Sequence, residues 1–200
     1  MLRRWLRITP TLTGRLSRLR ARLSRPLGPT DDDPSLLWAA VAAVLTTDSE
    51  AILLIRRADR PGDPWSGHTA LPGGRREPQD VDLLATAVRE SLEEIGLDLS
   101  SAILGGSLSD VVPRTPVLPP IAVRPFVFLL PTRPKLTLNQ EVASAQWVLL
   151  DELLRPGAHR TVQFDVAGQN RTVWAYQIED SVVWGMTERI LMDLFQRLAS

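Results

Sequence analysis

Residues 73–96, GGRREPQDVDLLATAVRESLEEIG, constrain the fold of this chain more than any other segment. Asp80 and Asp82 are both good helix N-caps, and Gly96 is a good C-terminal glycine, so we expect a helix between them. The side chains that recur at helical spacing and should face the core are Leu84, Val88, Leu92 and Ile95. The segment therefore predicts one amphipathic helix packed on a larger structure.

Three glutamates, Glu90, Glu93 and Glu94, lie near the end of this expected helix. At spacings i, i+3 and i+4 their Cβ atoms are about 5–6 Å apart, so the carboxylates repel one another unless something positive lies between them. We expect this sector to lie roughly opposite the core stripe, either as a solvated acidic face or as a metal site. Upstream, the glycines of LPGG let bare backbone and a ligand come close to the same point, with Gly73 among them, and this favours the metal site. Oxygen ligands suit Mg²⁺ or Mn²⁺, which bind substrate phosphates as well.

Composition bounds the rest of the molecule. The chain has 200 residues, 44% of them hydrophobic, which is enough for one main domain with an appended segment. It has no cysteine, which excludes disulfides and thiolate zinc sites and suits a reducing compartment, so we expect a cytoplasmic protein. No apolar run approaches the roughly 18–20 residues needed to span a bilayer.

The segments outside the expected helix alternate between short strands and helices. An apolar, turn, apolar pattern around DSE predicts a hairpin before residue 57, and a second hairpin should form where residues 162–166 and 172–177 flank AGQNR. Further strands are expected around residues 102–109, 122–130 and 144–149, and a last helix should begin at Thr187. The predicted class is α/β (α+β), a mixed sheet with helices on its faces.

The N-terminal 35 residues differ in kind from residues 36–200. Residues 1–30 hold eight arginines and no acid; taking these from the 23 bases leaves 15 against 23 acids in the rest of the chain. Leucines at helical spacing predict a basic amphipathic helix near residues 13–24, and they are Leu12, Leu16, Leu19 and Leu23. We expect this arm to pack on its own domain or on a second subunit of a homodimer; an anionic membrane surface or nucleic acid is the alternative partner.

The glutamate segment resembles a Nudix box, in which a glycine and a first glutamate precede Arg-Glu-aliphatic-x-Glu-Glu-x-Gly-aliphatic. Gly74 and the sequence RESLEEIGL at residues 89–97 supply this pattern. It departs from the pattern in three ways: Asp80 replaces the first glutamate, eight residues rather than seven separate it from Arg89, and Ser91 occupies an aliphatic position.

The departures are similar to the coenzyme A pyrophosphatase branch of the Nudix hydrolases, with Glu77 in place of its first aspartate. That branch also carries an upstream element that Leu53, Leu54, Arg57 and the sequence GHTALPGG at residues 67–74 resemble. Two later segments look like the same branch, NQEVASAQWVLLDELL and VVWGMTERILMDL. The resemblance spans about residues 36–198 and implies a Nudix fold.

The resemblance also implies an activity, the metal-dependent hydrolysis of a nucleoside diphosphate linked to another group. It implies Glu90, Glu94 and Glu93 as metal ligands together with a backbone carbonyl of the Gly74 region, for Mg²⁺ or Mn²⁺. Arg89 would orient the glutamates and pair with Asp80, and both Glu93 and Glu94 would take part in catalysis. Glu141 matches a position where relatives keep a further metal-binding or base carboxylate, although an exposed loop acid is the alternative.

Four other residues are candidates for substrate binding. Arg57 closes an apolar strand and is a candidate phosphate ligand, Gly73 lets substrate approach, His68 contacts either backbone or substrate, and Trp65 is a candidate stacking platform. We expect a small-molecule nucleotide substrate, most simply coenzyme A or an acyl-CoA, cleaved to 3′,5′-ADP and a phosphopantetheine. The alternatives are an ADP-ribose or other nucleoside diphosphate pyrophosphatase, and a non-catalytic nucleotide-sensing domain.

Overall fold

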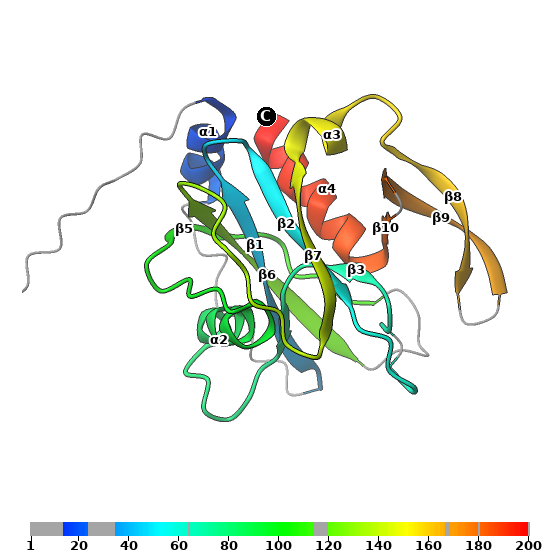
Figure 1. The fold of residues 1–200 in the computed structure, drawn as a ribbon, viewed down its shortest axis with the longest axis horizontal. Helices are drawn as coiled ribbons and strands as arrows, with labels where there is room; N and C mark the ends of the chain where they lie inside the picture. The colour runs from blue at the N-terminus through cyan, green and yellow to red at the C-terminus, as the bar shows by residue number, and fades with distance from the viewer. Residues whose placement is uncertain are drawn as a thin grey trace, which may run out of the picture.

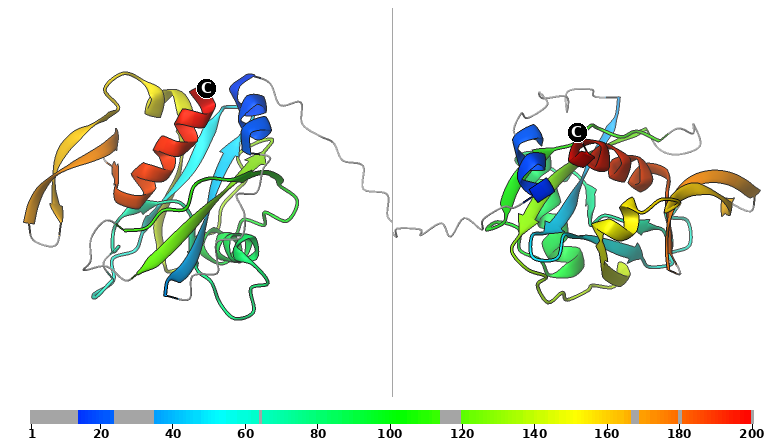
Figure 2. Two further views of the ribbon diagram at one scale, coloured as in Figure 1. Left: turned by 180° about the vertical axis from the view of Figure 1, so that it is seen from behind. Right: turned by 90° about the horizontal axis from the view of Figure 1, so that it is seen from above.

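The protein is described by a computed structural model that places residues 14–23, 35–63, 65–113, 120–166, 169–179 and 181–199. Figures 1 and 2 show a β-sheet with helices against both faces and a smaller sheet beside it. The helices are α1 (Gly14–Leu23), α2 (Leu83–Ile95), α3 (Leu150–Leu154) and α4 (Gly185–Ala199). The predicted α/β (α+β) class with a mixed sheet between helices is confirmed.

The large sheet has seven strands and the small sheet has three. The large one contains β1 (Leu37–Thr46), β2 (Ala51–Arg57), β3 (Thr69–Ala70), β4 (Gly73–Arg75), β5 (Ile103–Ser107), β6 (Ile121–Leu130) and β7 (Val142–Leu149). The small one contains β8 (His159–Val166), β9 (Gln169–Ile178) and β10 (Ser181–Trp184). Central strands β1 and β6 are parallel, whereas β2, β4, β5 and β7 pair antiparallel to their neighbours, so the sheet is mixed.

Two hydrophobic cores lie on the two faces of the large sheet. Because side chains alternate along a strand, Ala39, Ala43 and Leu45 of β1 belong to one cluster, with α1 and α4. Ala40, Ala42 and Val44 belong to the other, with α2. The nearly continuous apolar sequence of β1 is the expected pattern for a strand covered on both faces.

Helix α2 begins and ends at the predicted residues. Asp82 is the N-cap, and its side chain accepts a hydrogen bond of 2.7 Å from the Ala85 N–H. Gly96 has φ of 65°, the left-handed conformation that favours glycine, and its N–H donates to the Leu92 carbonyl at 3.0 Å.

The core stripe predicted for α2 is partly wrong. Leu92 is 53% exposed, and Leu84 and Val88 are only partly buried, whereas Ile95 is buried as expected. The fully covered positions belong to another sector, which consists of Leu83, Thr86, Ala87, Ser91, Glu94 and Ile95. The glutamate sector therefore borders the buried face and does not lie opposite it, because Glu94 is adjacent to Ile95 within that face.

Most of the remaining elements follow the predictions, with small shifts of boundary, whereas the short elements α3, β3, β4 and β10 were not predicted. The β1–β2 hairpin, the strands β5, β6 and β7, and the β8–β9 hairpin are present. Strand β9 already begins at Gln169, so the second hairpin connection is shorter than AGQNR. Helix α4 begins at Gly185, two residues before Thr187. None of the helices in the described ranges is long and apolar enough to cross a membrane.

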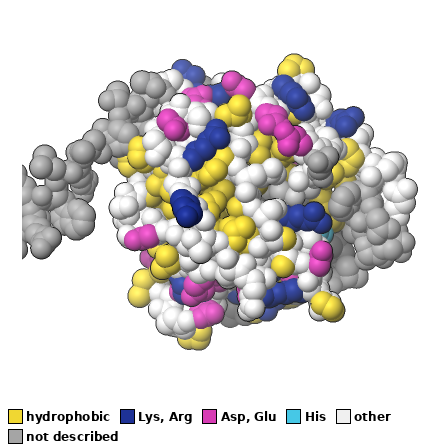
Figure 3. All heavy atoms as spheres, viewed as in Figure 1, with side chains coloured by type: hydrophobic (Ala, Val, Ile, Leu, Met, Phe, Trp, Pro, Cys, Tyr) yellow, Lys and Arg dark blue, Asp and Glu magenta, His cyan; other side chains and the backbone are white. Residues whose placement is uncertain are grey.

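Helix α1 is present where the sequence predicts a basic amphipathic helix. Leu16, Leu19 and Leu23 are buried in the cluster that contains α4, and Leu12 lies outside the described residues. Arg15 Nη2 lies 2.7 Å from Glu50 Oε2 and 2.7 Å from Asp151 Oδ1. Figure 3 shows basic and acidic side chains interspersed over one face of the molecule. The acidic excess of residues 36–200 thus supplies partners for this arginine.

Candidate active site

Strand β4 brings the glycines of LPGG against both β1 and α2. Gly73 has φ of 148°, and a Cβ there would overlap the Ala40 carbonyl oxygen and the backbone of Val41, since β4 pairs closely with β1. A Cβ on Gly74 would overlap the Glu90 carboxylate. The backbone contacts and the positive φ therefore require glycine at position 73, whereas a side chain at position 74 would displace the Glu90 carboxylate.

Glu94 is the most deeply buried carboxylate of the segment, with 2% of its surface exposed. Its Oε2 accepts a hydrogen bond of 2.9 Å from the Gly73 N–H, and its Oε1 lies 4.0 Å from Arg57 Nη1. Burial raises the pKa of Glu94 to about 7, and the charges of Glu90 and Glu141 add to the rise, against the effects of Gly73 and Arg57. A buried carboxylate with so little compensation is costly, which is typical of a functional position.

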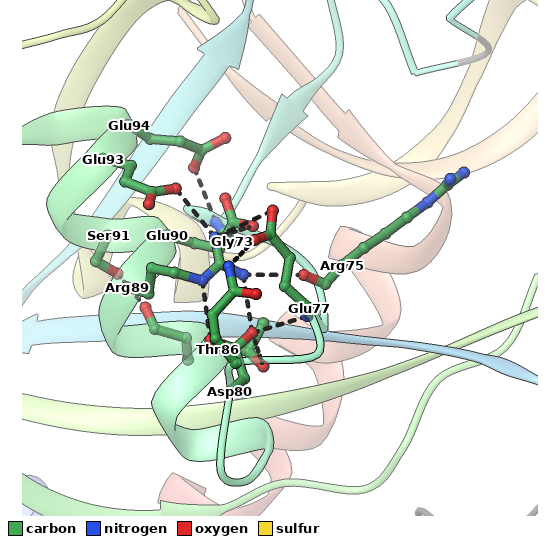
Figure 4. Close-up of polar contacts among 12 residues, drawn as sticks. Gly73, Arg75, Glu77, Asp80, Thr86, Arg89, Glu90, Ser91, Glu93 and Glu94 are labelled. Carbon is green, nitrogen blue, oxygen red and sulfur yellow. Dashed lines mark hydrogen bonds and ion pairs between the residues drawn. The ribbon is translucent and has the colours of Figure 1, made fainter.

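Arg89 connects the remaining acids of the segment, as Figure 4 shows. Its Nε and Nη2 each donate at 2.9 Å to the Asp80 carboxylate, and its Nη2 also donates to the Arg75 carbonyl at 3.0 Å. Its Nη1 donates at 3.0 Å to both Glu90 and Glu93. The predicted pairing of Arg89 with Asp80 is confirmed, and these bonds hold the pKa of Asp80 far below its usual range.

The expected convergence of three glutamates on one point is not seen. Within the described ranges, no three His, Cys, Asp or Glu side chains are arranged as a metal site. The reason lies in the contacts: Arg89 Nη1 bonds both Glu90 and Glu93, whereas Glu94 turns toward the Gly73 N–H. Glu93 is also the exposed member, with 55% of its side chain accessible.

The donor set nevertheless fits a divalent cation. Burial raises the pKa of Glu90, and the charges of Glu93 and Glu141 raise it further, while Arg89 lowers it. Glu90, Glu94 and Glu141 thus act on one another electrostatically, although Glu141 is remote in sequence. Carboxylate oxygens in mutual repulsion are the ligands that Mg²⁺ and Mn²⁺ bind.

Glu141 lies beside the end of β2, immediately before β7. Its carbonyl accepts from the Ala58 N–H at 2.8 Å, and its Oε1 lies 3.2 Å from Arg60 Nη2. The pairing of β2 with β7 places Arg57 opposite Val142, next to Glu141 in the chain. The fold thus brings Glu141 and Arg57 to the same end of the sheet as Glu94.

The loop after β2 contributes an acid that sequence reasoning missed. Asp63 Oδ2 accepts from Arg57 Nη2 at 2.9 Å, and its Oδ1 accepts from the Trp65 N–H at 2.9 Å. Asp63 thereby holds the guanidinium that faces Glu94. Arg60, which contacts Glu141, was missed as well. The sequence shows only that Asp63 and Arg60 lie in a Gly/Pro-rich loop, and this does not predict where their side chains point.

His68 and Trp65 are less closely tied to the carboxylates. The His68 ring packs against Trp184 with 4.8 Å between ring centres, and burial lowers the pKa of His68. The Trp65 side chain is partly buried against the cluster that contains α1 and α4. The structure therefore brings Glu90, Glu94, Arg89, Gly73, Gly74 and Arg57 together, with Glu141 near them, and gives His68 and Trp65 packing contacts.

The raised pKa of Glu94 predicts a pH-dependent stability difference. A carboxyl whose folded pKa is about 7 stabilises the fold fully below its unfolded value of 4.5, and this contribution is lost as pH rises through 7. Glutamine carries no titrating charge, so Glu94→Gln does not lose this contribution. As pH rises from about 5 to 8, we expect the unfolding free energy of Glu94→Gln to increase by on the order of 2 kcal/mol relative to that of wild type. Urea denaturation of both proteins in EDTA measures this difference.

Comparison of the two proteins matters because the pKa of His68 is shifted as well. Its lowered pKa makes stability increase with pH, opposite to the effect of Glu94, and this contribution cancels in the difference between the proteins. A difference that does not change with pH would contradict the assignment of a neutral-range pKa to Glu94.

The fold and the candidate site together define a class of protein. A mixed sheet between helices carries a glycine turn whose backbone N–H binds a buried glutamate, beside an arginine that bonds two further glutamates. A family model described as the NUDIX domain matches residues 36–166, and the chain belongs to the Nudix family.

The chain is also similar to individual proteins, one of them described as a Nudix hydrolase. A Yersinia pestis protein described as the uncharacterised Nudix hydrolase NudL is 28% identical over 162 residues, covering 80% of this chain and 79% of that protein. An uncharacterised protein of Schizosaccharomyces pombe is 43% identical over 119 residues, 57% of this chain. Those residues make up 36% of the yeast protein, so the matched part spans about a third of that relative.

Solved structures show the same fold. A MutT/nudix family protein from Enterococcus faecalis superposes with a TM-score of 0.57 at 17% identity, covering 92% of this chain and 69% of that one. A MutT protein from Methanosarcina mazei superposes with a TM-score of 0.52 at 19% identity, covering 84% of this chain and 95% of that one. The predicted Nudix fold is confirmed.

Proposed function

We propose that this Nudix protein hydrolyses a diphosphate bond in coenzyme A or an acyl-CoA, with Mg²⁺ or Mn²⁺, to give 3′,5′-ADP and the corresponding phosphopantetheine. The observation that carries the hydrolytic proposal is Glu94, a buried carboxylate whose pKa burial raises to about 7, held against the Gly73 N–H beside Glu90. A purely nucleotide-sensing domain gains nothing from a buried charge of this cost, which disfavours that alternative.

Each residue has a proposed role in this reaction. Glu90 and Glu94 are the main metal ligands, with Glu93 and the Gly74 carbonyl completing the set and Glu141 as a further ligand or base. The cation would neutralise diphosphate charge and activate water when bound. Arg89 holds Glu90 in place while it also bonds Asp80, and Arg57, which donates to Asp63, would bind a phosphate oxygen.

Coenzyme A is favoured by sequence features outside the glutamate segment. Leu53, Leu54, Arg57 and residues 67–74 resemble the upstream element of the coenzyme A branch, and residues 182–194 resemble its last segment. The main alternative substrate is ADP-ribose or another nucleoside diphosphate derivative, since these need the same glutamates. His68 and Trp65 belong to the loop that would contact the group beyond the diphosphate.

A substrate panel tests this proposal. Coenzyme A, ADP-ribose and nucleoside triphosphates are incubated with the full chain and Mg²⁺, and the nucleotide products are separated by ion-exchange chromatography. We expect kcat/KM for coenzyme A to exceed that for ADP-ribose by about tenfold, or ~1.4 kcal/mol in transition-state stabilisation. A tenfold preference in the opposite direction would assign the protein to the alternative class of substrate.

The chain is proposed to consist of a domain and an N-terminal arm. We infer a Nudix domain at residues 36–200 and a basic arm at residues 1–35, whose helix stabilises the domain by packing on it. A homodimer and a cytoplasmic location stay predictions, the first tested by mass measurement in solution and the second by cell fractionation.

A further inference from the structure

An open pocket of about 350 Å³ lies between the start of β1 and the loop that follows β4. Its lining includes Leu37 and Trp38 from β1, Arg75 and Arg76 from the glycine turn, and Pro78. The volume is within the usual range for small-molecule sites. Nothing in the proposed roles of the glutamates uses this pocket.

The pocket adjoins the glutamate site through shared residues. Arg75 follows Gly74 directly, and its carbonyl accepts from Arg89, which also bonds Glu90. Asp80, another lining residue, binds the same arginine at 2.9 Å. Arg89 therefore connects Glu90 to two residues that line the pocket.

The lining of the pocket suits a flat heterocycle. The Trp38 ring is only partly buried, and the Arg124 guanidinium lies 5.3 Å from its centre, held there by Asp110 at 2.8 Å. Leu37 is 47% exposed beside it. An aromatic ring next to apolar side chains is a common surface for a nucleobase to stack on.

The charges of the pocket favour an anion on the nucleoside. Arg75 is exposed, and within the described ranges its side chain has no hydrogen-bond or ion-pair partner; Figure 4 shows it extending away from the carboxylates. Arg76 also lines the pocket, and its Nη2 donates to the carbonyls of Asp80 and Val81 at 3.4 and 3.3 Å, so the anion is assigned to Arg75 and not to Arg76. The two lining acids, Asp80 and Glu77, both lie within 4.0 Å of Arg89, which offsets their charge.

We propose that this pocket binds the nucleoside end of the substrate, with the base on Trp38 and a ribose phosphate on Arg75. The inference rests on the proposed function, since it assigns the phosphorylated nucleoside of coenzyme A to one end of the diphosphate site. Arg75 thereby discriminates a nucleotide with a ribose phosphomonoester from one without it. ADP-ribose and dephospho-coenzyme A lack this group.

Kinetics with two matched substrates test the role of Arg75. Dephospho-coenzyme A differs from coenzyme A only in the missing 3′-phosphate, so the ratio of their kcat/KM values isolates recognition of that group. We expect wild type to prefer coenzyme A by about tenfold or more, Arg75→Ala to abolish the preference, and Arg75→Lys to keep part of it. Arg155→Ala, at an exposed arginine after α3, is the control and should keep the wild-type ratio. An unchanged ratio in Arg75→Ala would overturn the inference.

A binding measurement separates this inference from the proposed function. Calorimetric titration of the full chain with 3′,5′-ADP and with AMP needs no turnover, and we expect the bisphosphate to bind about tenfold more tightly in wild type but not in Arg75→Ala. If coenzyme A is not hydrolysed and this selectivity is present, the proposed substrate is wrong and the pocket assignment stands. If wild type binds both nucleotides equally, the pocket assignment is wrong whatever the substrate.

Discussion

Replacement of Glu94 by glutamine is expected to lower kcat by on the order of 10²-fold or more while the protein stays folded. Glutamine has nearly the same shape, and its side-chain oxygen can still accept the 2.9 Å bond from Gly73, so the fold loses little. What it loses is the negative charge that a divalent cation and a diphosphate need at this point. Because Glu94 is 2% exposed, removing its charge also removes a desolvation cost, and the melting temperature in EDTA should not fall.

The measurement combines turnover in saturating Mg²⁺ with thermal unfolding followed by circular dichroism. Glu152→Gln, on α3 and outside the proposed site, serves as the matched control and should keep wild-type kcat. Addition of EDTA to wild type should abolish turnover to a similar extent. Full activity of Glu94→Gln, or of wild type in EDTA, would refute the proposed metal site.

Local sequence signals predicted the elements that carry this site. The aspartate and glycine at the two ends of α2 act through their own backbone and its nearest neighbours, so Asp82 and Gly96 could be recognised without knowledge of the fold. The same holds for the β1–β2 hairpin, in which a short polar turn separates two apolar runs. Such signals depend on residues only a few positions apart.

The buried face of α2 could not be predicted because polar residues occupy it. Ser91 is fully covered, and its hydroxyl donates to the Ala87 carbonyl at 2.7 Å, while the Thr86 hydroxyl donates to Asp80 at 2.9 Å. Once these hydroxyls are paired, their burial costs little. A prediction from hydrophobicity alone therefore selects the wrong face of the helix: it buries Leu92, which is exposed, and exposes Ser91, which is buried.

The contacts between segments that are far apart in the chain also could not be predicted from the sequence. Arg57 and Asp63 are joined by the path of the loop after β2, and Arg60 meets Glu141 only because β2 pairs with β7. Glu141 itself was suggested by resemblance, since a single acid in a loop has no local signal. Where strand pairing places a side chain depends on the arrangement of the whole sheet, and the few residues around that side chain in the sequence do not determine it.

Loss of helix α1 is expected to destabilise the domain strongly. Leu19 is fully buried among residues of α1 and α4, so Leu19→Ala should lower the unfolding free energy by about 2–5 kcal/mol, a large share of the 5–15 kcal/mol typical of a domain. Deletion of residues 1–30 removes Leu16 and Leu23 as well and should lower the melting temperature further or change the oligomeric state. Denaturation in urea and mass measurement in solution test both variants, with the exposed Ser17→Ala as control.

The contact between α1 and β5 gives a second way to test this role. A Cβ on Gly106 of β5 would overlap the carbonyl oxygen of Leu23, and Gly106 has φ of 134°, so Gly106→Ala should displace the end of α1 and add strain to β5. In the intact chain this substitution should cost stability both by strain and by lost α1 packing, whereas in the chain lacking residues 1–30 only the strain remains. A smaller effect of Gly106→Ala in the truncated protein therefore measures the coupling between helix and strand. Equal effects in both chains, with unchanged stability after truncation and lost binding to anionic vesicles, would show instead that the arm is a membrane tether.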